Sequence, residues 1–250
     1  MSHVYITGDT HGDFGHVERF CKRWNTTKDD LLIVLGDNGV NYWGPHRDKK
    51  LKALLEELPI SFFFIKGNHD QRPSKKLYQL SMVVHPNIRG FAYIEPEFPN
   101  LMFSEMYGYY TFLCNTKRID SYVLGGAYSA DKYYRLEMQA MGRTGYRWFP
   151  DEQMTGKEME SAFESITTLN TYHPYIILSH TCPLKYIPHD MCSPLFDQST
   201  VDTTMEQWMD KVDEAVNYDR WFCGHWHTDR TIDKMRFMFH DIIDLEEATR

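Results

Sequence analysis

Residues 4–12 read VYITGDTHG, a short apolar run that passes directly into a glycine and then into polar side chains. The run Val4–Thr7 has the β-branched and aromatic composition of a strand. Strand and helix then alternate, with a helix predicted over Gly15–Trp24, a strand over Leu31–Leu35, a helix around Arg47–Leu58 and a strand over Ile60–Ile65. This alternation predicts parallel strands joined by right-handed crossovers.

The remainder of the chain mixes β-rich and helical segments. Between residues 83 and 128, turn signals separate the strands expected over Gly90–Ile94, Tyr107–Cys114 and Asp120–Leu124, which suggests an antiparallel run. Farther along, we expect helices over Asp151–Leu169 and Thr203–Val216, strands over Tyr175–Leu178 and Arg220–Cys223, and a closing hairpin from Thr231 to Ile243 around Lys234. No repeat or linker divides the chain, so the prediction is one α/β domain over residues 1–250, with two stacked sheets and helices outside.

The composition is typical of a globular protein and excludes several classes. The 250 residues include 27 Lys+Arg and 35 Asp+Glu, a formal charge of −8 that argues against a protein that coats nucleic acid. No apolar run is long enough to span a membrane, and the first residues lack the layout of a signal peptide. The five cysteines contain no Cys-x-x-Cys pair, which is typical of reduced thiols in a cytoplasmic protein.

Five of the predicted strands are each followed at once by candidate metal ligands. Because the carboxyl ends of parallel strands meet at one edge of a sheet, we expect these side chains to converge. Carboxylate, imidazole and amide groups without thiolate suit divalent manganese, iron or zinc. Seven ligands exceed the needs of one ion and suit two ions that share a carboxylate; they are Asp9, His11, Asp37, Asn68, His180, His225 and His227.

Each of these motifs, taken singly, has an ordinary explanation. Asp37 could cap the helix that follows it, and Asn68 could serve a turn. An isolated His-x-His pair arises by chance on many surfaces. The occurrence of such residues after all five strands favours a metal site over scattered polar loop residues.

The five blocks together resemble the signature of the calcineurin-like metallophosphoesterase family. They are Gly8-Asp9-Thr10-His11-Gly12, Gly36-Asp37-Asn38, Gly67-Asn68-His69-Asp70, His180 and Gly224-His225-Trp226-His227. The resemblance implies a four-layer α/β/β/α sandwich of two mixed sheets flanked by helices, and a phosphoesterase with two divalent metal ions. It implies that one ion is held by Asp9, His11 and His227 and the other by Asn68, His180 and His225, with Asp37 bridging both.

The same resemblance implies the mechanism and two catalytic residues. Water between two divalent ions is acidic enough to supply hydroxide, which would attack phosphorus in line. His69 would stabilise or protonate the leaving oxygen, and Asp70 would orient it. A carboxylate neighbour would also favour the charged form of His69. The alternative is that His69 and Asp70 form a purely structural pair.

Substrate residues are harder to predict. The arginine that clamps phosphate in the protein phosphatase branch of the family is missing, because residues 38–43 read NGVNYW. Arg72 is a possible replacement, and Asn68 is counted as a substrate contact as well as a ligand. Residues 126–150 form a possible cap or lid, in which Lys132 and Arg135, with Arg143 and Arg147, could face an anionic substrate; a solvated basic loop is the alternative. The many aromatic residues between 91 and 150 could stack a nucleobase or fill a core.

The favoured function is hydrolysis of a phosphomonoester, either a small phosphorylated molecule or a nucleotide. Phosphodiester hydrolysis on nucleotides or nucleic acid ends is the first alternative, although the charge of −8 disfavours nucleic acid. Protein phosphatase activity is weaker because of the missing arginine. A non-catalytic scaffold for protein binding, known in the same family, would show eroded ligand positions, and this sequence shows none.

Overall fold

Two seven-stranded mixed sheets form the centre of the computed structural model, which describes residues 2–169, 175–192 and 197–250. The first sheet runs in the order β14 (Ile243–Asp244), β1 (Val4–Thr7), β2 (Leu31–Val34), β3 (Ser61–Phe64), β7 (Phe98–Phe103), β6 (Phe91–Glu95) and β4 (Gln79–Met82). The second runs β12 (Arg230–Ile232), β13 (Met235–Phe237), β11 (Tyr218–Cys223), β10 (Tyr175–Ser179), β9 (Arg118–Leu124), β8 (Tyr107–Leu113) and β5 (Ile88–Arg89).

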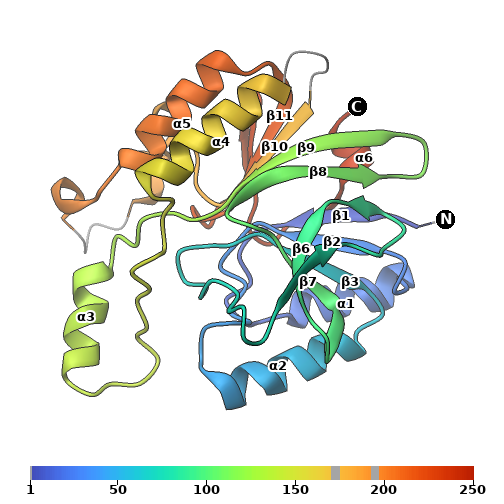
Figure 1. Cartoon of the computed structure of the whole chain (residues 1–250), viewed down its shortest axis with the longest axis horizontal. Coiled ribbons are helices and arrows are strands. Elements are labelled where there is room, and N and C mark those ends of the chain that lie inside the picture. The colour runs from blue at the N-terminus through green and yellow to red at the C-terminus, as the bar shows by residue number, and fades with distance from the viewer. Residues whose placement is uncertain (1, 170–174, 193–196) are drawn as a thin grey trace.

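Helices cover the outer face of each sheet (Figure 1). On the first sheet, α1 (Gly15–Trp24) and α2 (Pro45–Glu57) bury Val17, Cys21 and Leu55. On the second, α4 (Gly156–Leu169) and α5 (Thr204–Ala215) pack through side chains such as Ile166 and Met209. The predicted α/β/β/α sandwich is therefore confirmed. The remaining helices are short or peripheral: α3 (Lys132–Ala140), α6 (Leu245–Ala248) and three 3-10 turns at Leu184–Tyr186, His189–Met191 and Gln198–Thr200.

The central strands are apolar on both faces because both faces are covered. In β2, Leu31 and Ile33 enter the core between the sheets, whereas Leu32 and Val34 face the helices. In β3, Phe63 faces inward and Phe62 faces outward in the same way. Each strand thus reads as a continuous apolar run instead of an alternating one. The predicted parallel pairing of β1, β2 and β3 is confirmed.

The expected antiparallel run between residues 83 and 128 is wrong in one respect, because it divides between the two sheets. β7 pairs parallel with β3 and antiparallel with β6 in the first sheet. β8 and β9 pair antiparallel in the second sheet, and β9 is parallel to β10. The segment therefore carries the chain from one sheet to the other.

Two predicted boundaries also differ from the structure. Helix α4 begins at Gly156, not Asp151, because Thr155 and Glu158 form a reciprocal capping box. The C-terminal hairpin around Lys234 is confirmed but is shorter than expected, comprising only β12 and β13. The chain then crosses to the first sheet, where β14 pairs antiparallel with β1.

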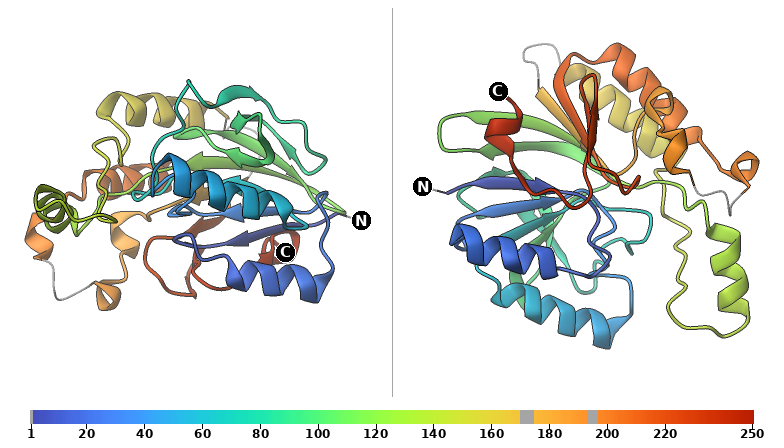
Figure 2. Two further views of the ribbon diagram at one scale, coloured as in Figure 1. Left: turned by 90° about the horizontal axis from the view of Figure 1, so that it is seen from below. Right: turned by 180° about the vertical axis from the view of Figure 1, so that it is seen from behind.

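The predicted cap region contains a helix that projects from the sandwich. Figures 1 and 2 show α3 and the loop after it standing apart from both sheets in every view. None of the side chains of α3 is buried. In the described part of the chain, no helix is long and apolar enough to cross a membrane.

Candidate metal centre

The predicted ligands lie on loops that leave the carboxyl ends of β1, β2, β3, β10 and β11. Several of these loops turn through backbone conformations that side chains disfavour. His11, Asp37, His225 and His227 have φ values of 46°, 42°, 66° and 47°. Left-handed conformations of residues other than glycine cost free energy and concentrate at functional sites. The backbone is therefore bent at the positions that present ligands.

Close packing between these loops explains the glycines that precede the ligands. A Cβ atom on Gly67 would lie 2.1 Å from Asp37 Oδ1, and one on Gly224 would lie 2.3 Å from Asp9 Oδ1. Neither distance is compatible with a side chain. Each glycine thus makes room for the ligand of a neighbouring loop.

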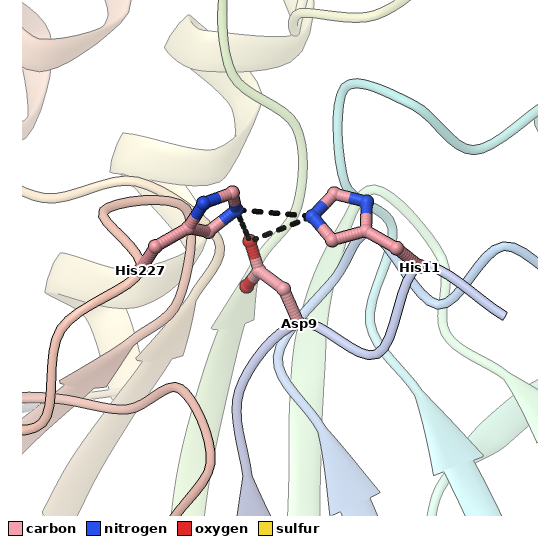
Figure 3. Close-up of side chains that lie close together, drawn as sticks. All are labelled: Asp9, His11 and His227. Carbon is pink, nitrogen blue, oxygen red and sulfur yellow. Dashed lines mark hydrogen bonds and ion pairs between the residues drawn. The ribbon is translucent and has the colours of Figure 1, made fainter. Parts of the chain in front are cut away.

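A first group of ligands consists of Asp9, His11 and His227 (Figure 3). The Nε2 atom of His227 is 3.2 Å from Asp9 Oδ2 and 3.0 Å from His11 Nε2. His11 Nε2 lies 3.8 Å from the same carboxylate oxygen. Three potential ligand atoms from the two ends of the chain therefore face one point.

A second group contains Asp37, His180 and Asn68. His180 Nε2 is 3.3 Å from Asp37 Oδ1 and 2.9 Å from Asn68 Oδ1. His180 Nδ1 lies 2.7 Å from the carbonyl oxygen of Leu35, a contact that fixes the ring so that Nε2 faces the site. Asp9 also belongs to this group by distance, so the two groups are contiguous.

His225 joins the centre through its backbone as well as its ring. Its N–H donates to Asp9 Oδ1 at 2.9 Å. Its ring centroid is 5.0 Å from that of His180. All seven predicted ligands are thus brought together.

The donor set fits divalent cations. Asp9 Oδ2 is buried and accepts no well-aligned hydrogen bond, although the His227 ring lies within ion-pair distance of it. A buried carboxylate oxygen without a partner is costly unless a cation compensates it. The ligand atoms are oxygen and imidazole nitrogen, which suit manganese, iron or zinc.

The electrostatics of the centre are dominated by buried carboxylates. Burial opposes a charge on His180, but Asp37 and Asp9 outweigh it and raise the pKa of His180 to about 9. Burial lowers the pKa of His225 to about 3, and His180 adds to that effect. Asp37 is buried, yet the histidines around it hold its pKa well below the usual range. The centre therefore attracts positive charge.

The structure corrects the predicted partnership of His69 and Asp70. The carboxylate of Asp70 accepts hydrogen bonds from the backbone of Gly67 (2.8 Å) and the side chain of Asn38 (2.8 Å), so it ties two ligand loops together. His69 Nδ1 is buried without a partner, and Nε2 faces Asn68 and Arg135. Burial lowers the pKa of His69 to about 4, against the expected stabilisation of its charged form.

Two predicted substrate residues lie elsewhere. The Arg72 guanidinium binds Glu158 (2.7 Å) and the carbonyl oxygens of Asp151 and Gln153, at the start of α4. The Lys132 ammonium lies over aromatic rings, 4.6 Å from the centroid of Trp148. None of these contacts involves a predicted metal ligand.

Arg135 is the predicted substrate residue that does reach the centre. Its Nη2 lies 3.2 Å from His69 Nε2, and its Nη1 donates to the Tyr42 hydroxyl at 2.7 Å. An ion pair of 2.7 Å with Asp131 holds the other side of the guanidinium. A cavity of about 280 Å³ opens here, lined by residues that include His11, His69, Tyr42 and Arg135.

Sequence reasoning missed the residues that support Asn68. The Asn68 Nδ2 donates to Ser129 Oγ at 2.9 Å, and Ser129 Oγ donates to Glu152 at 2.5 Å. This chain of hydrogen bonds turns the amide oxygen of Asn68 toward His180. Ser129 and Glu152 are buried and 23 residues apart, so no local signal in the sequence indicates the pair.

Comparison with known families agrees with this geometry. The calcineurin-like phosphoesterase family matches residues 2–229, which contain every ligand described above. The chain belongs to this family. A calcineurin-like phosphoesterase with this donor set is a metal-dependent phosphoric ester hydrolase.

Individual proteins add little to the family match. One solved structure similar to this calcineurin-like phosphoesterase is phosphopantetheinyl hydrolase from Mycobacterium tuberculosis, which is 15% identical and superposes with a TM-score of 0.45. The match covers 95% of this chain and 88% of that one. No curated protein gives a significant match to the sequence.

Proposed function

We propose that this calcineurin-like phosphoesterase hydrolyses a phosphomonoester of a small molecule. The observation that carries the proposal is the cavity of about 280 Å³ beside His11 and His69. A dry cavity of about 150 Å³ is enough for a benzene ring. The larger volume suits a phosphate group with one ring-sized substituent.

We propose two resident divalent ions, of manganese, iron or zinc. Asp9, His11 and His227 are suited to hold one; Asn68, His180 and His225 are suited to hold the other. Asp37, 3.3 Å from His180 and packed against the loop that carries His69, is placed to serve both. When bound, such ions would lower the pKa of water and neutralise phosphoryl charge.

The residues around the cavity would act on the substrate directly. The Arg135 guanidinium would donate to phosphoryl oxygens, since two of its nitrogens already face the His69 and Tyr42 side of the cavity. His69 would donate a hydrogen bond to the leaving oxygen. Asn68 would contact a phosphoryl oxygen only through its amide, which Ser129 orients.

The alternatives make different demands on the same site. A phosphodiesterase needs room for a second substituent on phosphorus, and a protein phosphatase needs an open surface. A scaffold needs no intact ligand set, whereas all seven predicted ligands are present here. The five cysteines are free thiols, which supports a cytoplasmic location.

A substrate panel tests the proposal. The Mn²⁺-loaded protein would be assayed with 4-nitrophenyl phosphate, bis(4-nitrophenyl) phosphate and a phosphoserine peptide, with and without chelator. We expect chelator-sensitive hydrolysis, with the monoester preferred by at least about tenfold in kcat/KM. Preference for the diester or the peptide would replace the proposal with the corresponding alternative. Failure to hydrolyse any of them would favour the scaffold.

A further inference from the structure

The cavity beside the metal centre has an aromatic wall, formed by Tyr42, Trp43, Tyr134 and Tyr146. The first two rings lie on the loop between β2 and α2, and the last two lie on α3 and the loop that follows it. His11 and His69 line the same cavity from the metal side. A substrate with its phosphate at the histidines would therefore place its leaving group against aromatic rings.

The rings of the wall differ in how far their neighbours cover them. Tyr134 and Tyr146 pack at right angles, with centroids 5.6 Å apart and an interplanar angle of 89°. In an edge-to-face pair, the ring that presents its edge keeps both faces free of its partner. The Arg47 guanidinium backs the Trp43 ring at 3.6 Å, so one face of that ring is already covered. Of the four rings, Tyr134 is the most exposed, at 42%, so it offers the most open aromatic surface.

Hydrogen bonds hold this wall in place before any substrate arrives. The Tyr42 hydroxyl donates to the Gly145 carbonyl at 2.6 Å and accepts from the backbone N–H of Arg147 at 3.1 Å. Arg147 returns a bond from its guanidinium to the Tyr42 carbonyl at 2.8 Å. The loop after α3 is therefore fastened to the loop after β2, and Tyr146 lies between the two fastened residues.

The wall carries little net charge. Asp131 and Arg135 line the cavity as an ion pair of 2.7 Å, so their charges largely cancel beyond the immediate contact. The remaining wall residues are tyrosine, tryptophan and glycine. A leaving group against this wall would therefore contact mainly aromatic rings.

We propose that the α3 segment, here residues 130–148, selects phosphomonoesters whose leaving alcohol carries a planar aromatic ring. The inference rests on the proposed phosphomonoesterase function and names its substrate class. Tyr134 and Tyr146 are the specificity-determining residues: this edge-to-face pair stacks the ring while His69 and the ligand loops hold the phosphate. Stacking on an aromatic side chain strengthens binding about five- to hundredfold per ring.

Two matched substrates isolate the contribution of the ring. Benzyl phosphate and cyclohexylmethyl phosphate have the same shape class and leaving alcohols of similar acidity, but only the first has a π face. We expect the wild-type protein to prefer benzyl phosphate by about tenfold in kcat/KM, through KM. Tyr134→Ala and Tyr134→Leu should reduce that preference to about twofold or less, and Tyr134→Phe should retain it.

A control variant lies on the same helix. Tyr133 is 63% exposed and is not among the cavity residues, so Tyr133→Ala should leave the preference unchanged. Because Tyr134 is itself 42% exposed, its substitution should not unfold the protein, which circular dichroism would verify. Equal kcat/KM for the two substrates in the wild-type protein would overturn the inference, as would an unchanged preference in Tyr134→Ala.

Binding measurements separate this inference from the function on which it rests. Benzylphosphonate and cyclohexylmethylphosphonate cannot be hydrolysed, and their affinities for the Mn²⁺-loaded protein can be compared by calorimetry. Preferential binding of benzylphosphonate without turnover of any monoester would support the aromatic site and reject the proposed catalysis. Turnover of monoesters with equal phosphonate affinities would keep the catalysis and reject the aromatic site.

Discussion

The metal centre and the α3 segment border the same cavity, but they are built in opposite ways. In the centre, Asp9, Asp37, Asn68 and His180 are buried on loops where Gly67 and Gly224 leave no room for a Cβ atom, while His11 and His227 face the exposed side. The α3 segment has no buried side chain in its helix and is fastened mainly through Tyr42. The comparison indicates that close packing sets the positions of the metal ligands. Substrate choice instead depends on a segment whose helix does not pack into the core.

The largest effect on activity and metal content is expected from substitution of Asp37, the carboxylate proposed to serve both ions. Asp37→Asn removes the negative charge that faces His180 and His69. We expect kcat/KM to fall by about a thousandfold, the scale of losing a group that stabilises transition-state charge. Metal analysis should show fewer than one ion per chain. The exposed Asp219→Asn is the control, and retention of two ions by Asp37→Asn would contradict a bridging role.

The next largest effect is expected at His69, which lies between the metal centre and the α3 segment. Its substitution separates an effect on catalysis from an effect on metal binding. His69 faces Arg135 of α3 and also borders the ligand loops. His69→Asn should lower kcat by about a hundredfold, the scale of losing one hydrogen-bond donor to the charge that develops in the transition state. The metal content should remain that of the wild-type protein. If His69→Asn lost bound metal as well as activity, His69 would be a metal ligand and not only a substrate contact.

Two glycine-to-alanine substitutions compare the stability cost of adding a Cβ atom in the packed metal centre and at a site with free space. In Gly67→Ala the new Cβ would meet Asp37 Oδ1 at 2.1 Å, whereas in Gly156→Ala it would meet nothing within 4 Å. We expect the first to lower the free energy of unfolding by about 3 kcal/mol. The second should raise it by up to about 1 kcal/mol, because alanine favours the helix. Urea denaturation measures both, and equal effects would show that the loops can relax.

The contrast between the regions also explains what the sequence could predict. Each predicted ligand follows a buried run within a few residues, as Asp9 follows Val4–Thr7, so local order alone predicts that these side chains gather at one end of the strands. The α3 helix is about as amphipathic as α4 and α5 but buries none of its side chains, so its apolar pattern does not show where it lies in the fold. Strand β7 was missed because Pro99 and Asn100 interrupt its apolar pattern, although it pairs with β3 inside the sheet.

The roles of polar partners were predicted less well than the ligands. Asp70 was expected to contact its sequence neighbour His69, but three backbone N–H groups of two loops surround its carboxylate instead. Ser129 and Glu152 are brought together at the two ends of the α3 segment by tertiary structure alone. Such hydrogen-bond partners depend on loop conformation, which single-sequence patterns do not encode.

Substitution of Arg72 tests whether this residue stabilises the fold or binds substrate. Its guanidinium holds the start of α4 through Glu158 and two carbonyl oxygens, so Arg72→Met should lower the free energy of unfolding by about 1–2 kcal/mol. The KM for a phosphomonoester should not change. The exposed Lys50→Met is the control for loss of a positive charge. An increase in KM without loss of stability would restore Arg72 as a substrate residue.

The smallest effect is expected on the outer surface of the α3 segment. Met141 is 61% exposed immediately after α3, and it is not one of the cavity residues. Met141→Ser should change the free energy of unfolding by less than about 0.5 kcal/mol, as is usual for exposed positions away from special contacts. Its kcat/KM should equal that of the wild-type protein.

A larger loss of stability, measured by urea denaturation at two protein concentrations, would mean that Met141 is covered in solution. If the loss of stability also depended on protein concentration, Met141 would be buried against a second copy of the chain. The α3 segment would then be constrained by packing, as the metal centre is.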